Sequence, residues 1–287
     1  MAETLARWKI GDVTITRVVE LTQTQDLSWL LPAAKPDAVR GIDWLRPHFA
    51  DEKGFGKLSI HALIVESQGQ RIIVDTCIGN DKKLPGMDYW SGRQSDFLTR
   101  LAAAGAPADS VDTVLCTHLH VDHVGWNTRM QDGRWVPTFG NARYLWNRAE
   151  YAYWDKAKGA MFESLMSESV RPVFDAGLVD LVDEDHDVTD EVRLEPTPGH
   201  TPGHVSVHIT SRGEEAIITG DFIHHPVQCA RPEWSSSFDF DAAAGIETRR
   251  KFFDRYAGRP VLIIGTHFAG VTAGRLVRDG DAYRLDC

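Results

Sequence analysis

Residues 117–123 constrain this chain more than any other stretch, because they place three histidines and an aspartate within six residues. The stretch reads Thr-His-Leu-His-Val-Asp-His and follows the apolar run 111–116, which predicts a buried strand. Polar side chains directly after such a strand lie at the edge of an α/β sheet where binding sites form. On a helix, His118 and Asp122 would share a face and His120 would point elsewhere, whereas on a strand-end loop all these side chains can converge. Imidazole and carboxylate groups together predict a metal site.

Three later strand ends carry the same types of ligand. His200 lies in the turn Pro-Gly-His-Thr-Pro-Gly-His, Asp221 ends the apolar run 217–221, and His267 ends the run 261–267. With these residues, the chain resembles the metallo-β-lactamase fold superfamily over about residues 58–270. The resemblance implies an α/β fold, the four-layer αββα sandwich, in which two similar halves pack face to face.

The resemblance also implies a ligand set for two divalent ions. One ion is expected on His118, His120 and His200, the second on Asp122, His123 and His267, with Asp221 bridging the two. Zinc is the expected metal, and manganese, iron or cobalt are alternatives. A hydroxide shared by the ions would be the nucleophile, and Asp122 would accept its proton and pass it to the leaving group.

Two further residues are predicted to support these ligands. Asp75 ends the apolar run 72–75 at a position where the family has an aspartate, so we expect it to orient a ligand histidine. Capping of a turn is an equally good interpretation of Asp75. His204 is expected either in a turn or as a group that orients a ligand.

The aspartate at position 221 narrows the class of enzyme. True β-lactamases of this fold usually carry a cysteine or serine there, so Asp221 favours the lactonase, thioesterase and phosphotriesterase branches. Only 20 residues follow His267, which favours a stand-alone hydrolase resembling acyl-homoserine lactonases and methyl-parathion-hydrolase-like enzymes. A Gly-x-Ser-x-Gly turn, a Walker loop and a dinucleotide fingerprint are all absent from the sequence.

Aromatic residues beside the ligands favour an apolar substrate. Trp126, Phe222 and Phe268 are predicted to line the pocket, and packing within the loops is the alternative for each. We therefore expect hydrolysis of small hydrophobic lactones or carboxylic esters, with phosphotriesters as weaker substrates. The alternative is a metal-containing binding or sensing protein of the same fold with little turnover.

Charge and composition exclude other partners. The net charge of −10, with no basic cluster, argues against nucleic acid. No apolar run reaches the roughly 18 residues of a membrane span, and the N-terminus has no hydrophobic signal region, so a cytoplasmic location without membrane contact is expected. The four cysteines show no paired spacing and are expected to be reduced thiols. A homodimer is left open.

The order of apolar and polar stretches predicts strands alternating with helices in a single domain over residues 1–287. Residues 22–56 are apolar but lack a clear period, and we interpret them as an ordered excursion near the site mouth, a subunit contact or a packed loop. Strands are predicted at 13–21, 57–66, 71–75, 111–116, 142–146, 178–182, 192–196, 205–210, 216–221, 260–266, 275–277 and 283–285. Helices are predicted at 95–105, after Asn147, at 164–174 and at 241–256, and the acidic run 183–187 is predicted to be a solvated turn.

Overall fold

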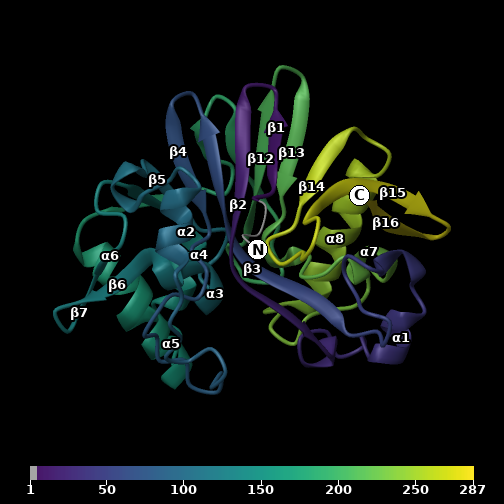
Figure 1. Cartoon of the computed structure of the whole chain (residues 1–287), viewed down its shortest axis with the longest axis horizontal. Coiled ribbons are helices and arrows are strands. Elements are labelled where there is room, and N and C mark those ends of the chain that lie inside the picture. Colours follow the sequence, from purple (N-terminus) through teal and green to yellow (C-terminus); the bar gives the residue numbers. More distant parts are fainter. Residues whose placement is uncertain (1–4) are drawn as a thin grey trace.

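Two seven-stranded sheets pack face to face in the computed structural model, which describes residues 5–287 (Figure 1). Helices α2, α4 and α6 flank the first sheet, α3 and α5 lie below it at the ends of its strands, and α7 and α8 flank the second sheet (Figure 1). The predicted four-layer α/β sandwich is therefore confirmed.

The first sheet has the strand order β1-β2-β3-β4-β5-β8-β9, and the second runs from β10 to β16 in sequence order. The strands of the first sheet are β1 Arg7–Ile10, β2 Val13–Gln25, β3 Gly56–Ser67, β4 Gln70–Val74, β5 Thr113–Leu115, β8 Arg143–Asn147 and β9 Val179–Val182. Those of the second are β10 Asp187–Thr189, β11 Val192–Pro196, β12 Val205–Ser211, β13 Glu214–Ile218, β14 Val261–Ile264, β15 Ala273–Asp279 and β16 Ala282–Asp286. A separate hairpin consists of β6 Thr128–Gln131 and β7 Arg134–Pro137.

The helices are short apart from the last. They are α1 Pro36–Arg40, α2 Phe97–Ala103, α3 Val121–Val124, α4 Arg148–Trp154, α5 Ala160–Leu165, α6 Arg171–Asp175, α7 Val227–Ala230 and α8 Ala242–Tyr256. Single-turn 3-10 helices are η1 Leu27–Trp29, η2 Asp43–Leu45, η3 Ala108–Ser110, η4 Gly125–Asn127 and η6 Gly220–Phe222, and η5 Met166–Val170 is a π-helix. In the part of the chain that the structure describes, no helix is long and apolar enough to span a membrane.

The hydrophobic core consists of three apolar layers, one between the sheets and one beneath each set of helices. Strands β3 and β4 have buried side chains on both faces, because one face packs on the opposite sheet and the other on helices. Their sequences therefore read as continuous apolar runs rather than as an alternating pattern. Three contact layers are what a four-layer sandwich requires.

Parallel strand pairs decide where the site forms. β4, β5, β8 and β9 run parallel in the first sheet, as do β13 and β14 in the second. Carboxyl ends of parallel strands meet at one edge of a sheet. The ends of β5, β13 and β14 therefore bring residues 117–123, Asp221 and His267 to the same side of the molecule.

Most predicted strands and helices occur within a few residues of their expected bounds. Asn147 caps α4 as predicted, accepting hydrogen bonds from the backbone N–H of Ala149 (2.7 Å) and Glu150 (3.2 Å). The predicted helix 164–174 is a chain of three segments, α5, η5 and α6. Asp187, assigned to a turn, starts the edge strand β10. Strands β1, β6 and β7 and helices α1 and α7 were missed, because they are short and lack a clear period.

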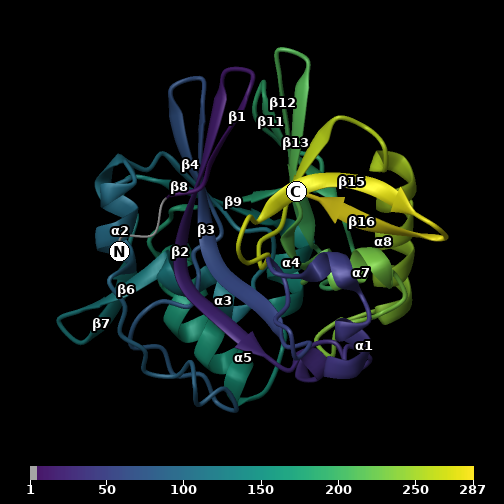
Figure 2. The same cartoon turned by 45° about the vertical axis from the view of Figure 1, so that its right-hand side comes forward.

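Residues 22–56 pack against the second sheet. Strands β2 and β3 continue together as a long twisted hairpin that reaches α1 (Figure 2). Leu27, Leu45 and Phe49 are fully buried in the apolar layer that also contains helices α7 and α8. His225 fastens this segment to the second sheet, because its Nε2 donates a hydrogen bond to the Phe49 carbonyl oxygen (2.8 Å).

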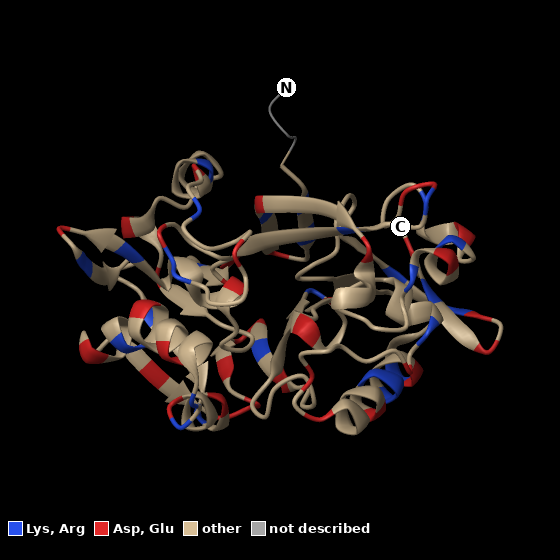
Figure 3. Ribbon diagram, turned by 90° about the horizontal axis from the view of Figure 1, so that it is seen from below, with Lys and Arg blue, Asp and Glu red and all other residues tan. Residues whose placement is uncertain are grey.

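Charged residues of both signs are interspersed along the ribbon (Figure 3). The net charge of −10 is thus spread over many elements and does not form one acidic block.

Candidate metal centre

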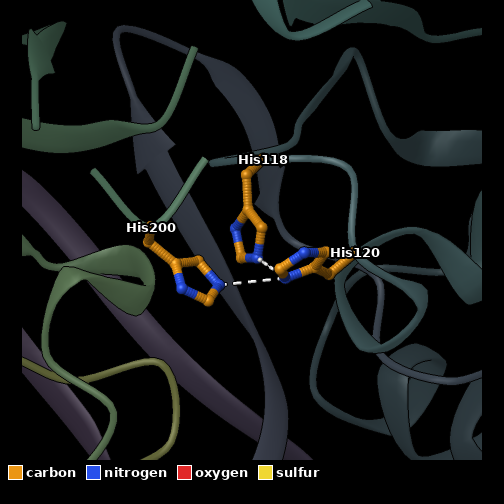
Figure 4. Close-up of side chains that lie close together, drawn as sticks. All are labelled: His118, His120 and His200. Atoms are coloured by element: carbon orange, nitrogen blue, oxygen red, sulfur yellow. Dashed lines mark hydrogen bonds between the residues drawn. The ribbon is translucent and has the colours of Figure 1, made fainter. Parts of the chain in front are cut away.

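The rings of His118, His120 and His200 converge, although they come from two loops that belong to different sheets (Figure 4). We call these three residues the first group. Nδ1 of His120 lies 3.0 Å from Nε2 of His118 and 2.9 Å from Nε2 of His200. His118 and His120 follow β5, whereas His200 lies in the turn between β11 and β12. Their three ring nitrogens therefore face one point between the sheets.

A second group lies beside the first. Nε2 of His123 and Nε2 of His267 are 3.2 Å apart, and Oδ2 of Asp122 lies 3.5 Å from Nε2 of His267. Asp122 and His123 belong to helix α3, so the predicted strand-end loop ends in a single helical turn. Because α3 starts only after His120, the helix does not separate the ligand side chains.

One oxygen of Asp221 lies between the two groups. Its Oδ2 is 3.0 Å from His267 Nε2, 3.2 Å from His123 Nε2, 3.8 Å from His200 Nε2 and 3.9 Å from His118 Nε2. Its Oδ1 accepts a hydrogen bond from Oγ1 of Thr266 (2.9 Å), which fixes the orientation of the carboxylate. The structure thus places all seven predicted ligands within two adjoining groups.

Outward hydrogen bonds fix the tautomers of four histidines. Nδ1 of His123 donates to Asp75 Oδ2 (2.8 Å), and Nδ1 of His200 donates to Asp239 Oδ1 (2.8 Å). Nδ1 of His118 faces Thr117 Oγ1 (3.1 Å), and Nδ1 of His267 donates to the Ser59 carbonyl oxygen (3.1 Å). In each ring Nδ1 makes the outward contact, so Nε2 is the nitrogen that faces the centre of the site.

Burial and mutual charge set the protonation of the site. Burial lowers the pKa of His118 and His120 well below the usual histidine value, so both rings are neutral. Burial also disfavours the charged form of His123, but the carboxylates of Asp221 and Asp75 outweigh it and raise the pKa of His123. Burial raises the pKa of Asp221, but His123 and His267 outweigh it and hold that pKa well below the usual range. Asp221 is therefore an ionised carboxylate.

Asp75 occupies the place predicted for an orienting residue. Besides His123, it accepts hydrogen bonds from the backbone N–H of Thr117 (2.8 Å) and from the Thr117 hydroxyl. Its backbone has a positive φ of 59°, a conformation that aspartate tolerates better than most residues. Asp75 thus lies in a turn and also contacts a ligand histidine, so the two interpretations are compatible.

His204 positions Asp221 through the backbone. Its Nε2 accepts the N–H of Asp221 (2.7 Å), and its Nδ1 donates to Thr197 Oγ1 (2.8 Å). Gly220 has a φ of 62°, and a Cβ there would lie 2.6 Å from His204 Nε2. A glycine at position 220 is therefore required for the close approach of His204.

Two acidic residues at the site were missed by the sequence analysis. Glu150 is buried, and its carboxylate accepts the N–H of Leu119 (3.0 Å), the N–H of Gly203 (3.0 Å) and Nε1 of Trp154 (2.6 Å). It thus joins the first ligand loop to the loop of His200. The position of Glu150 in the first turn of a capped helix, four residues before Trp154, gave no sign of these contacts. Asp239, which holds His200, lies in a loop without any motif.

We expect Asp239→Asn to weaken binding of one ion by about tenfold to a hundredfold. Asp239 Oδ2 accepts the N–H of Ser236 (2.9 Å) while Oδ1 accepts from His200, and an amide has only one oxygen for these two donors. Competition with a chelator, followed by elemental analysis, measures the change. Asp241→Asn is the control, since Asp241 is exposed and caps α8, a role that asparagine also fills. Equal ion affinity in both variants would contradict the orienting role of Asp239.

A cavity of about 230 Å³ opens over the site. Five of the seven predicted ligands line it, and His118 and His123 lie behind them. Other lining residues are mostly apolar and come from both sides of the molecule: Trp29, Leu30, Leu58, Ile60, Met87, Trp90, Val121, Trp154, Met161, Phe162, Leu165 and Phe238, with Gln23 and His224 as further polar groups. Among the described residues, no lysine or arginine lines this cavity.

The structure corrects the prediction of Trp126, Phe222 and Phe268 as pocket residues. Nε1 of Trp126 donates to a buried carboxylate oxygen of Glu20 (2.7 Å), and Phe222 and Phe268 pack in the layer under the helices of the second sheet. None of the three lines the cavity. Nearness to a ligand in the sequence does not decide which way a side chain points: Phe222 and Phe268 face away from the site, whereas Val121, between two ligands, lines the cavity. The aromatic lining comes instead from distant segments, including Trp29 of η1 and Trp154 of α4.

The profile of the Metallo-beta-lactamase superfamily matches residues 55–263, and the chain belongs to this superfamily. N-acyl homoserine lactonase of Bacillus cereus is 25% identical over 178 residues, which are 57% of this chain and 64% of the relative. N-acyl homoserine lactonase of Bacillus thuringiensis is 29% identical over 177 residues, with the same coverage. The chain thus spans about 64% of the length of the curated relatives that it matches.

Similarity to solved structures extends over the whole chain, or nearly so. The hydrolase AbOPH is 25% identical, with a TM-score of 0.81, and the match covers 100% of this chain and 98% of AbOPH. AidC, a dizinc quorum-quenching lactonase solved with the product N-hexanoyl-L-homoserine, has a TM-score of 0.79 at 19% identity, covering 98% of this chain and 96% of AidC. The fold and the superfamily agree with the resemblance found in the sequence.

Proposed function

We propose that this protein is a dinuclear-metal hydrolase of neutral, hydrophobic lactones and carboxylic esters, with weaker action on phosphotriesters. The observation that supports this proposal best is the placement of the seven ligands at the base of an apolar cavity. The lactonase activity of the curated relatives also supports it. We further propose that residues 1–287 act as one domain, in which residues 22–56 help to form the substrate pocket.

The residues present fit two divalent ions. Nε2 of His118 and Nε2 of His200 both face Nδ1 of His120, at 3.0 and 2.9 Å, and a single proton on Nδ1 can satisfy only one of these two acceptors, whereas a cation among the rings would satisfy all three nitrogens. We assign His118, His120 and His200 to one ion, Asp122, His123 and His267 to the second, and Asp221 to both. Imidazole and carboxylate ligands suit zinc, and manganese, iron or cobalt are alternatives.

The chemistry divides between the ions and the chain. Two bound ions would supply a water molecule whose pKa is lowered towards neutrality and a positive charge beside the carbonyl oxygen. We assign proton transfer to Asp122 rather than to Asp221, because the Asp122 side chain is more accessible from the cavity. It is 14% exposed, whereas the side chain of Asp221 is 4% exposed. The Asp122 carboxylate can accept the proton of the nucleophile and pass it to the oxygen of the leaving group. The apolar walls exclude competing water and hold an acyl chain or aryl group.

The lining of the cavity sets the expected substrate range. A β-lactam carries a carboxylate that needs a cationic partner, and the described cavity lining contains neither lysine nor arginine. We expect kcat/KM for a long-chain lactone or an aryl ester to exceed that for a cephalosporin by more than about tenfold, or 1.4 kcal/mol of transition-state binding.

The test uses zinc-loaded protein and four substrates: an aryl ester, a long-chain lactone, a phosphotriester and a cephalosporin. A preference for the cephalosporin would contradict the substrate class. The second candidate, a binding or sensing protein, predicts tight binding of a lactone with no measurable turnover by protein that holds two ions. Turnover of at least one ester or lactone therefore separates the two functions.

A further inference from the structure

His224 lines the cavity beside the ligand groups but has no place among the seven proposed ligands. It is 3% exposed, and its Nδ1 is buried without a hydrogen-bond partner. A buried polar atom without a partner costs free energy. Because Nδ1 makes no polar contact, any polar role of this ring belongs to Nε2.

The surroundings hold this ring in one position. The backbone N–H of His224 donates to Oε1 of Gln228 (2.8 Å), whose Nε2 donates to the Trp234 carbonyl oxygen (2.8 Å). The ring meets His200 edge to face, with centroids 4.6 Å apart, and lies parallel to His267 at 6.2 Å. His224 is thus fixed in place before any substrate arrives, as a group that stabilises a transition state must be.

The contacts of the two ring nitrogens indicate where the proton lies. Nδ1 faces no acceptor, whereas Nε2 lies 3.5 Å from Oδ2 of the ionised Asp221. The proton is therefore better placed on Nε2, where it points towards a negative charge. A separation of 3.5 Å is long for a hydrogen bond, so this N–H is available to another acceptor at the base of the cavity.

We propose that His224 is a further catalytic residue, which donates a hydrogen bond from Nε2–H to the substrate carbonyl oxygen as that oxygen gains negative charge. This inference rests on the proposed hydrolase function. When the nucleophilic oxygen bonds to the acyl carbon, the π electron pair of the C=O bond moves to the carbonyl oxygen. That pair returns when the bond to the leaving oxygen breaks, and His224 keeps its proton throughout. A donor aimed at the developing charge is worth about a hundredfold to a thousandfold in kcat.

A third ion is the alternative use of His224, because His200, His224 and Asp239 also form a group of possible ligands. The geometry argues against it, since Asp239 Oδ1 already accepts the Nδ1 proton of His200 at 2.8 Å. An ion there would have to displace that proton. Elemental analysis distinguishes the two uses.

The experiment compares His224→Met with His224→Gln in zinc-loaded protein. The two side chains have similar shape, but only glutamine carries an N–H donor at the end of its chain. We expect His224→Met to keep two ions and to lose about a hundredfold in kcat/KM on an aryl ester, and His224→Gln to recover at least tenfold of that loss. Affinity for monomethyl decylphosphonate, whose tetrahedral anionic centre resembles the transition state, should fall with the methionine variant and return with glutamine. Affinity for 1-decanol, which tests the apolar walls, should stay unchanged.

His208→Gln is the matched control. His208 is also a buried histidine, but its ring nitrogens already have partners, Arg193 Nη2 (3.1 Å) and Glu215 Oε2 (3.3 Å), and it does not line the cavity. This variant should lower the melting temperature and leave kcat/KM within about threefold of the wild type.

Each result decides about His224. The proposal is overturned if His224→Met, holding two ions, keeps both kcat/KM and phosphonate affinity within about threefold of the wild type. It is also overturned if wild-type protein holds three ions and the variant holds two. If the wild type with two ions hydrolyses no substrate, the proposed function is wrong. Loss and recovery of phosphonate affinity would then still support the hydrogen bond from His224.

Discussion

Asp221→Ala is expected to remove both ions and to reduce hydrolysis below detection. Oδ2 of Asp221 lies 3.0 Å from His267 Nε2 in one group and 3.8 Å from His200 Nε2 in the other, so a single truncation takes a ligand atom from both. It also removes the negative charge that offsets two divalent ions in a buried site, where charge is costly. Elemental analysis of protein purified without chelator should give two ions per wild-type chain and close to none for the variant.

Glu214→Ala is the control for this variant. Glu214 begins β13, the strand that leads to Asp221, but it is exposed and lies at the opposite end. The substitution Glu214→Ala removes one negative charge, as Asp221→Ala does, but it leaves the site intact. Ion content and turnover should therefore not change. If Asp221→Ala keeps two tightly bound ions, the assignment of Asp221 to both groups is wrong.

Asp122→Asn is expected to keep most of the bound metal and to lower kcat by about a hundredfold to ten-thousandfold. An amide oxygen can replace the carboxylate as a weak ligand, but it cannot accept the proton of the nucleophile. His123 and His267 remain to hold the second ion. The loss should therefore appear in kcat more than in ion content.

The leaving group of the substrate tests this role further. An alkyl lactone has a basic leaving oxygen that needs a proton, whereas a nitrophenyl ester does not. Asp122→Asn should therefore impair the lactone more than the nitrophenyl ester. An equal loss on both substrates at full ion content would contradict proton transfer to the leaving group, and near-normal turnover would contradict any proton role for Asp122.

The fold was predictable because the chain repeats one local rule. Three of the four ligand segments follow an apolar run, and in the structure each of these runs is a buried strand: β5 before His118, β13 before Asp221 and β14 before His267. Parallel pairing then brings the strand ends together, which explains how widely separated residues could be assigned to one site. Elements without a period, such as α1, α7 and the edge strand β1, carry no such signal.

The pocket was less predictable than the ligands, because nearness in sequence does not determine which side chains share a cavity. Trp126 and Phe268 lie one to three residues from ligands and pack in the core, whereas Trp29 and Phe238 line the cavity from remote loops. The same reason hid Asp239, whose contact with His200 spans 39 residues. Such contacts depend on the tertiary packing of irregular segments, which no local pattern encodes.

The two halves of the sandwich contribute unequal numbers of residues to each of the two ligand groups. Residues from the first sheet supply two members of each, His118 and His120 or Asp122 and His123, and the second sheet supplies His200 or His267. A nascent chain that has completed only its first half therefore lacks one member of each group and the shared Asp221. If the groups hold ions as proposed, ion uptake would come late in folding and would stabilise the assembled sandwich, by about 4 kcal/mol when the free ion exceeds its Kd a thousandfold. Bound ions would thus stabilise the fully folded chain and not a chain in which only the first half has folded.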